Sequence, residues 1–313
     1  MQPLTDLAPA AGLSWLIEAR PRDIADVATL LPAIQQVVPA SRFDAFAARN
    51  GGIDLRAPLQ LVVAGYEGST LWLVRLPLDP ARVEQAFDRH LYHVDGRSID
   101  RVTRDPLGGV VRTWGSFGGE PEELVLFGRE ALGLAIGHGE PLRAAELFAM
   151  ERLRRASPAL RAAPLKRAAA LLGDAPLRAF APGPFTGDVA GGLGGLLGAA
   201  TAVAGRARVV DSGGDRPGLA FSVILLGGWG DDAQAAKSRL LSAFGVLADS
   251  GIGRLLGLRD PIAPARVHAT SEALTIDVTV DAYTLAAGLH DATGATVDAI
   301  MGRWPRNDVR TTR

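Results

Sequence analysis

The chain has 313 residues, with 33 Lys and Arg against 34 Asp and Glu, and its formal net charge at pH 7 is −1. A balance so close to zero supplies no overall field for nucleic acid, so we expect no nucleic-acid partner. The chain contains no Cys, which excludes disulfides, Cys-ligated zinc, iron–sulfur clusters and a cysteine nucleophile. With 48% hydrophobic and 21% charged residues, its composition is that of a globular protein.

The first half of the chain predicts strand pairs separated by helices. After a strand at Leu13–Ala19, Pro21 begins a helix whose apolar residues recur at helical spacing. A strand pair follows, Leu59–Tyr66 with Thr70–Leu76, and then a helix capped by Asp79. An extra hairpin, a second strand pair and another helix complete this half. Short turns between paired strands indicate antiparallel pairing.

The second half repeats this order. Leu177–Ala181 predicts a strand, and the Gly- and Ala-rich segment 189–205 predicts a helix. A strand pair follows, Ala207–Asp211 with Leu219–Leu226, and then a helix capped by Asp231. A last strand pair and a last helix end the pattern.

The two halves contain segments that resemble each other. Residues 125–148 and 267–290 align without gaps at an offset of 142, and each reads as strand, tight turn, alternating strand and helix. We therefore expect an α+β fold of two tandem related units, 1–155 and 156–313, each an antiparallel β-sheet with helices packed on one face. The two sheets could pack on each other or join edge to edge. Residues 303–313 predict a basic, disordered tail.

Known catalytic motifs are absent: the sequence has no G-x-x-x-x-G-K-[ST], no H-E-x-x-H and no G-x-S-x-G. The candidates for a metal or acid–base site are His90 and His93, three residues apart at a helix end, with Asp95 as a nearby carboxylate. We favour a structural interpretation, in which His90 packs beside Phe87 and His93 is a cation near the helix C-terminus. We accordingly predict no catalytic residue, no metal and no cofactor.

The run GGLGGLLGAATAVAG, residues 191–205, is the most unusual stretch. Gly191, Gly195 and Gly198 belong to G-x-x-x-G pairs, which let helices approach closely. We favour a small-residue helix packed against a sheet. The alternatives are a flexible flap over a hydrophobic pocket and a peripheral membrane contact. In a ligand-binding role these glycines and Trp229 would form the site.

Neither a signal peptide nor a membrane span is expected in this chain. Its first residues, MQPLTDLAPAAGLSW, lack a basic region followed by an apolar stretch. The longest uncharged run, Val189–Gly205, has 17 residues, which is shorter than a spanning helix requires.

Four segments carry a resemblance to a known class of proteins: SWLIEARPRDI, RFDAFAARNGGIDLR, STLWLVRLP and APGPFTG. They resemble uncharacterised envelope proteins of high-GC Gram-negative bacteria, many of them predicted lipoproteins, which share a domain of unknown function. The resemblance implies a structural pattern, in which an early helical segment leads to a Gly-Ile-Asp-Leu step and a hairpin. It implies export, peripheral or lipid-anchored membrane association, and no catalytic residue.

These observations favour a non-enzymatic envelope protein, a scaffold that binds a protein partner or a hydrophobic or lipidic ligand. A second hypothesis is a hydrolase or metal-dependent enzyme using His90, His93 and Asp95. A third is a self-assembling structural subunit, a homo-oligomer joined through an apolar sheet face or the glycine-rich helix. A cytoplasmic location is the alternative to the envelope.

Overall fold

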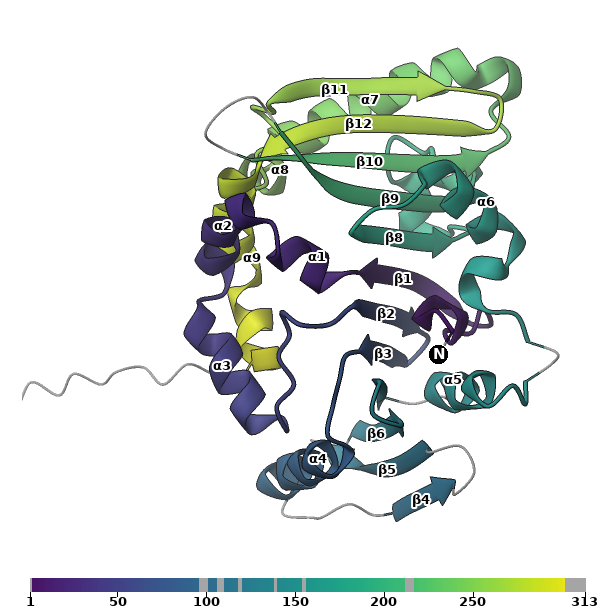
Figure 1. Ribbon diagram of the computed structural model, residues 1–313. Coiled ribbons are helices and arrows are strands. Elements are labelled where there is room, and N and C mark those ends of the chain that lie inside the picture. The colour runs from purple at the N-terminus through teal and green to yellow at the C-terminus, as the bar shows by residue number, and fades with distance from the viewer. Residues whose placement is uncertain are drawn as a thin grey trace, which may run out of the picture.

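One antiparallel sheet of twelve strands, counted over the described residues, runs through the whole molecule (Figure 1). The computed structural model describes residues 2–95, 101–105, 110–117, 120–137, 140–153, 156–211 and 217–301. The strands are β1 (Leu13–Ala19), β2 (Gln60–Tyr66), β3 (Ser69–Arg75), β4 (Arg101–Asp105), β5 (Val110–Phe117), β6 (Glu120–Phe127), β7 (Ala131–Gly137), β8 (Leu177–Pro182), β9 (Ala200–Val210), β10 (Gly218–Gly227), β11 (Ala263–Ala269) and β12 (Ala273–Asp281). Their order across the sheet is β11-β12-β10-β9-β8-β1-β2-β3-β7-β6-β5-β4. The fold is therefore α+β, as predicted, and the strands of the two halves meet edge to edge.

Helices flank this sheet and connect its strands. The α-helices are α1 (Pro21–Ala25), α2 (Leu31–Val37), α3 (Ala40–Arg49), α4 (Pro80–Asp95), α5 (Pro141–Ala149), α6 (Ala163–Leu172), α7 (Ala233–Asp249), α8 (Gly251–Leu255) and α9 (Ala282–Met301). The 3-10 turns are η1 (Leu4–Asp6), η2 (Ala28–Leu30), η3 (Ala159–Arg161), η4 (Gly187–Gly191), η5 (Leu197–Ala199) and η6 (Gly230–Asp232). Within the described ranges, none of the helices has the length and apolar character needed to cross a bilayer.

The halves are joined by the antiparallel pair β1 and β8. Leu16 lies opposite Phe180 and Glu18 opposite Arg178 in this pair. Leu16 and Phe180 are both buried in the largest apolar core of the molecule. The joint is therefore part of a continuous core.

Helices cover both faces of the sheet, which differs from the predicted cover on one face of each unit. On β3, Leu71 and Leu73 belong to a core shared with η1, α5 and α6, and we call this side of the sheet the first face. Val74, which points the other way, belongs to a core shared with α4. On this second face, α7 packs over the far end of the sheet. Because the strands carry apolar residues on both sides, both sides need cover.

The C-terminal helix α9 does not lie on the first face. Ala282 and Ala286 of α9 pack with Leu30 and Ala33, at the start of α2, in a separate small core. The continuous helix predicted from Pro21 is divided here into α1, η2 and α2. This division lets the segment fold around α9.

Candidate functional site

Helices cover the first face unevenly. In the first half, α5 contacts β3, β6 and β7. In the second half, α6 contacts β8, β9 and β10, while β11 and β12 are contacted by α7 from the second face. The helix that follows β12, α9, packs on α2 instead. An open cavity of about 440 Å³ remains on the first face beside α6, and we call it the shelf.

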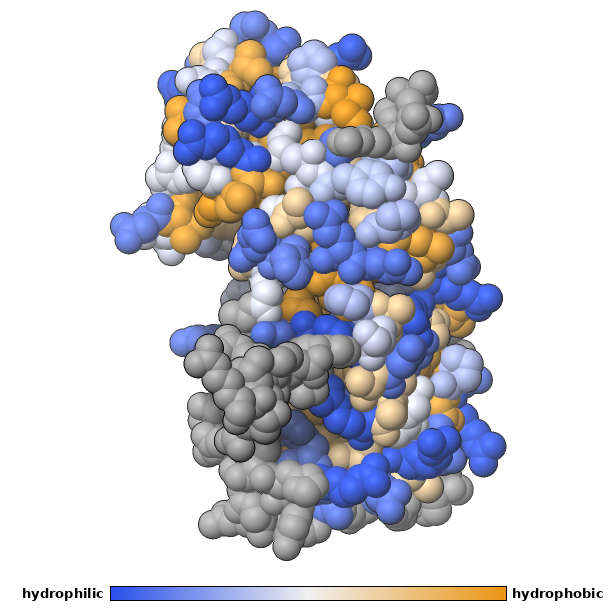
Figure 2. Space-filling view, turned by 90° about the vertical axis from the view of Figure 1, so that its left-hand side faces the viewer, coloured by the Kyte–Doolittle hydropathy of each residue, from blue (hydrophilic) through white to orange (hydrophobic). Residues whose placement is uncertain are grey.

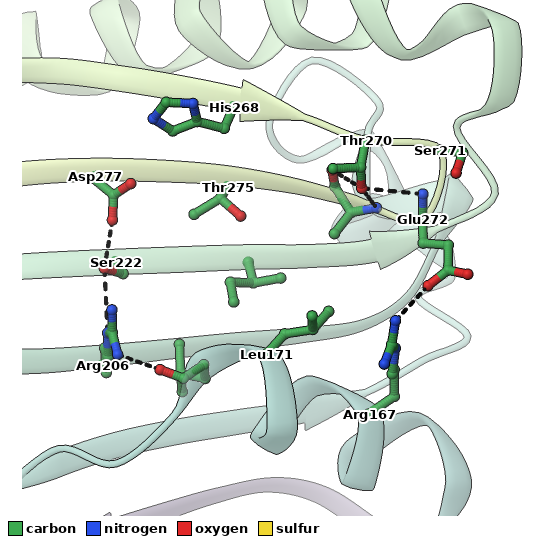
Figure 3. Close-up of a pocket in the computed structure, with 13 residues that line it drawn as sticks. Arg167, Leu171, Arg206, Ser222, His268, Thr270, Ser271, Glu272, Thr275 and Asp277 are labelled. Atoms are coloured by element: carbon green, nitrogen blue, oxygen red, sulfur yellow. Dashed lines mark hydrogen bonds and ion pairs between the residues drawn. The ribbon is translucent and has the colours of Figure 1, made fainter.

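The shelf combines an apolar centre with polar ends. Ile224 and Ala273 form the centre of its floor, and Leu171 of α6 stands beside them. Figure 3 shows polar side chains from the neighbouring strands reaching into the same space, with α6 along one side. The remaining lining residues are Arg167, Leu172, Arg206, Ser222, His268, Thr270, Ser271, Glu272, Thr275 and Asp277.

Three polar residues form a hydrogen-bonded row at one end of the shelf. Arg206, Ser222 and Asp277 lie opposite one another on β9, β10 and β12. The Nε of Arg206 donates to the Ser222 hydroxyl at 3.4 Å, and that hydroxyl donates to Asp277 at 2.5 Å. Arg206 also donates to the carbonyl of Leu172 at the C-terminus of α6, where a cation is favourable. The row is held in place at its Arg206 end (Figure 3).

The carboxylate of Asp277 has no cation partner in the part of the chain that the structure describes. Its cross-strand neighbour on the edge strand is Arg266, but these two side chains form no ion pair. Asp277 is partly buried, and it lines the cavity. At the other end of the shelf, Glu272 is paired with Arg167 at 2.9 Å. Asp277 is thus the carboxylate of the shelf that is left available to a ligand.

The polar row continues beneath α6 to the joint between the halves. Arg178, opposite Arg206 in register, donates from Nε and Nη2 to Glu18 at 3.0 and 2.5 Å. Gln60 donates to the other oxygen of Glu18 at 2.8 Å. The Glu18 and Arg178 side chains are mostly buried. This part of the row stabilises the joint, and only its outer end reaches the shelf.

The hydrogen bonds of the row are not those of an activated serine nucleophile. A serine nucleophile passes its proton to a base, most often an imidazole. Here the Ser222 hydroxyl donates to a carboxylate, while His268 is exposed on β11 in register with Thr275. Fixed hydrogen bonds of this kind hold polar groups ready for a ligand.

The structure places His90 beside a carboxylate that the sequence did not suggest. Its Nε2 lies 3.8 Å from Glu122 of β6, with the imidazole 46% and the carboxylate 7% exposed. Burial lowers the pKa of His90 below its usual value. The backbone of His93 and Asp95 belongs to α4, but their side chains lie outside the described residues. Among the described residues, no group of three or more His, Asp or Glu is arranged to hold a metal.

The glycine-rich segment is not the predicted helix. Residues 189–205 form the end of η4, then η5 and the beginning of β9. Gly194 and Gly195 have φ of +69° and +85°, a conformation that ends regular helix. Gly191, Gly195 and Gly198 are exposed, and Gly191 and Gly195 face open space. The segment is a surface loop.

Trp229 belongs to the core, not to a pocket. It is buried with Leu196 under α7, and its indole N–H donates to the carbonyl of Leu225 at 3.3 Å. The glycine-rich loop therefore packs against the second face through Leu196. The contacts described for Trp229 are those of packing.

Comparisons with known proteins add no family to this description. No protein-family model matches the chain, and neither the curated proteins nor the solved structures contain a significant match.

The shelf residues were missed in the sequence, although a signal for them exists. The offset of 142 aligns Gly133 with Thr275 and Ala135 with Asp277. In the first half these first-face positions are small and lie near α5, and in the second half they are polar and line the shelf. Polar residues at alternate positions of a strand indicate that the face they share is open to solvent.

Proposed function

We propose that the chain is a non-enzymatic binding scaffold whose shelf accepts an aliphatic amine presented by a protein partner. The observation that carries this proposal is Asp277, a partly buried carboxylate on an open cavity with a serine hydrogen bond and no cation partner among the described residues. A buried carboxylate is favoured when a cation completes it.

The apolar part of the shelf supports an aliphatic chain on that amine. Ile224, Ala273 and Leu171 lie between the Asp277 end and the Arg167–Glu272 end. A lysine side chain has four methylene groups and a terminal ammonium, so it matches an apolar floor that ends at a carboxylate. The ligand class is therefore a lysine side chain on the surface of a protein.

Binding of a lysine analogue tests the proposal. We expect N-acetyl-lysine methylamide to shift the NMR signals of the shelf residues, while the norleucine analogue, which lacks the amine, binds at least about ten-fold more weakly. Asp277→Asn should abolish the difference between the two compounds. The matched control is Asp260→Asn, an exposed carboxylate outside the shelf. Equal binding of the two compounds to the unmodified chain would overturn the proposal.

Two tandem related units, 1–155 and 156–313, are part of the same proposal. The support is the strand order on either side of the joint, β1-β2-β3-β7-β6 in one direction and β8-β9-β10-β12-β11 in the other. In addition, α4 and α7 follow the corresponding hairpins, β2–β3 and β9–β10, and both pack on the second face. Duplication would explain why one unit has a covered face at the place where the other has the shelf.

An envelope location belongs to the proposal because of the sequence resemblance. Fractionation of the native host tests it: the chain should appear in the periplasmic or membrane fraction, and recovery with cytoplasmic markers would contradict it. The enzyme hypothesis and the self-assembly hypothesis stay predictions. For the enzyme hypothesis, the carboxylate that the structure describes beside His90 is Glu122.

A further inference from the structure

The corner between α7 and α8 carries the densest group of exposed aliphatic side chains in the described part of the chain. Six of the thirteen large exposed hydrophobic residues fall between positions 241 and 262. Val246 is 72% exposed and Ile252 is 65% exposed. The others are Leu241, Leu247, Leu255 and Ile262. We call these six residues the aliphatic corner.

The fold holds these side chains outward. Ser250, between the two helices, accepts a hydrogen bond from the N–H of Gly253 and donates to the carbonyl of Leu247 at 2.6 Å. On its inner side, α8 packs closely on Gly288 of α9, where a Cβ would meet the backbone of Leu255. The corner is therefore a rigid surface feature. Figure 2 looks at the side of the molecule that carries α8 and α9, and apolar residues gather in its upper part.

Basic residues outnumber acidic ones in the chain segment that contains α8 and most of α7. Between positions 237 and 260 the chain has Lys237, Arg239, Arg254 and Arg259 against Asp249 and Asp260. None of the three arginines takes part in an ion pair within the described ranges. The segment thus has an excess of positive charge, whereas the whole chain has a formal net charge of −1.

We propose that the aliphatic corner is a membrane-docking surface that inserts Val246, Ile252 and their neighbours into the interface of a bilayer with anionic lipids. Interfacial binding combines a shallowly inserted apolar surface with basic residues that contact anionic headgroups. The corner supplies both, and its cations have no acidic partner among the described residues to compete with lipid. The surface lies apart from the shelf, so this proposal goes beyond the proposed function and does not depend on it.

Sedimentation with vesicles tests the proposal on the full chain. We expect binding to vesicles of equal parts phosphatidylglycerol and phosphatidylcholine, weaker binding to phosphatidylcholine alone, and a further loss as salt is added. Val246→Ser combined with Ile252→Ser should lower the bound fraction about five-fold or more, because both side chains would insert. Replacing Arg254 and Arg259 by Gln should remove the preference for the anionic vesicles.

The control is Val189→Ser, since Val189 is 56% exposed and lies on the glycine-rich loop, the other candidate for membrane contact. It should leave binding unchanged. Circular dichroism should be the same for all variants, because every changed side chain is exposed. The proposal is overturned if anionic vesicles are not bound, or if Val189→Ser weakens binding as much as the double variant. It is also overturned if the corner instead joins two copies, seen as a dimer that the double variant dissociates.

Discussion

On the first face, α5 contacts β6 and β7, the last strand pair of the first half, whereas in the second half α6 lies over β8, β9 and β10 and an open cavity lies beside it. In the first half, α5 lies directly on the sheet, so that a Cβ on Gly133 would be 2.5 Å from the Cδ1 atom of Leu142. In the second half, β12 presents Thr275 and Asp277 to a cavity. The helix after β12 packs on α2, and polar residues line the cavity on the first face.

This difference shows that a covered part of a sheet face and an open part carry different residues. A covered floor needs small or apolar residues, because buried polar groups without partners are costly. When the covering helix packs elsewhere, the same positions accept hydroxyl, imidazole and carboxylate groups at little cost. The neighbouring strands stay stabilised from the second face by α7. The second half therefore combines strands packed by α7 on the second face with an accessible polar cavity on the first face.

The largest expected effect compares the two ends of the polar row. Glu18→Ala removes the acceptor of Arg178 and Gln60 at the joint, where the ion pair is mostly buried, and should destabilise the protein by about 3–5 kcal/mol. Glu272→Ala, which breaks the exposed pair with Arg167 at the shelf, should cost less than about 1 kcal/mol. Urea unfolding followed by circular dichroism measures both. Similar losses would mean that the joint is as exposed as the shelf.

The next effect compares the two helices of the first face. Leu142 of α5 is buried, and Leu142→Ala should cost about 2–4 kcal/mol through lost burial and the cavity left behind. Leu171 of α6 borders the shelf and is exposed, so Leu171→Ala should cost less than about 1 kcal/mol. Urea unfolding followed by circular dichroism measures the loss of stability in both variants. An equal cost at both positions would show that α6 is covered by something at the shelf.

The sequence predicted the strands well because their patterns are local. Paired apolar runs and short turns indicated β2–β3, β6–β7 and β11–β12. Asp79 caps its helix as expected, accepting a hydrogen bond from a backbone N–H group, and Asp281 caps α9 in the same way. The helix predicted for the glycine-rich segment was wrong, because small residues are compatible both with close helix packing and with loops. Only the positive φ of Gly194 and Gly195, which a sequence does not show, separates the two.

The site was harder to predict because it depends on where a distant helix packs. The gapless alignment of the two halves puts Val125 with Val267, yet Val125 lies on the first face and Val267 on the second. The reason is the turn: Phe127 pairs with Ala131 in one hairpin, and Ala269 pairs with Leu274 in the other, which is one residue longer. A shift of one residue exchanges the faces of a strand, so His268 reaches the shelf where the alignment places a residue of the other face.

The smallest expected effect is a pH-dependent change in stability. It concerns the connections that follow β1 and β8, the two strands of the joint. The long connection after β1 contains Arg56, which bonds Asp54 and Asp44 and lies over the ring of Phe43, whereas the connection after β8 is the glycine-rich loop. Hydrogen bonding to Arg56 holds the pKa of Asp54 below its usual value of 3.8. A lowered carboxyl pKa stabilises the folded state above pH 3.8, and this contribution is lost as the pH falls through the folded pKa.

Arg56→Ala should therefore lower stability at pH 7 more than at pH 2.5, because the contribution of the lowered Asp54 pKa is fully present at pH 7 and declines as the pH falls below 3.8. Because both side chains are about a third exposed, solvent screening limits the pH-dependent part to roughly 0.5 kcal/mol. Urea unfolding at the two pH values measures it, with Arg259→Ala as the control, since that exposed arginine has no ion pair among the described residues. A loss that is the same at both pH values would assign the role of Arg56 to its packing on Phe43 instead of to its charge.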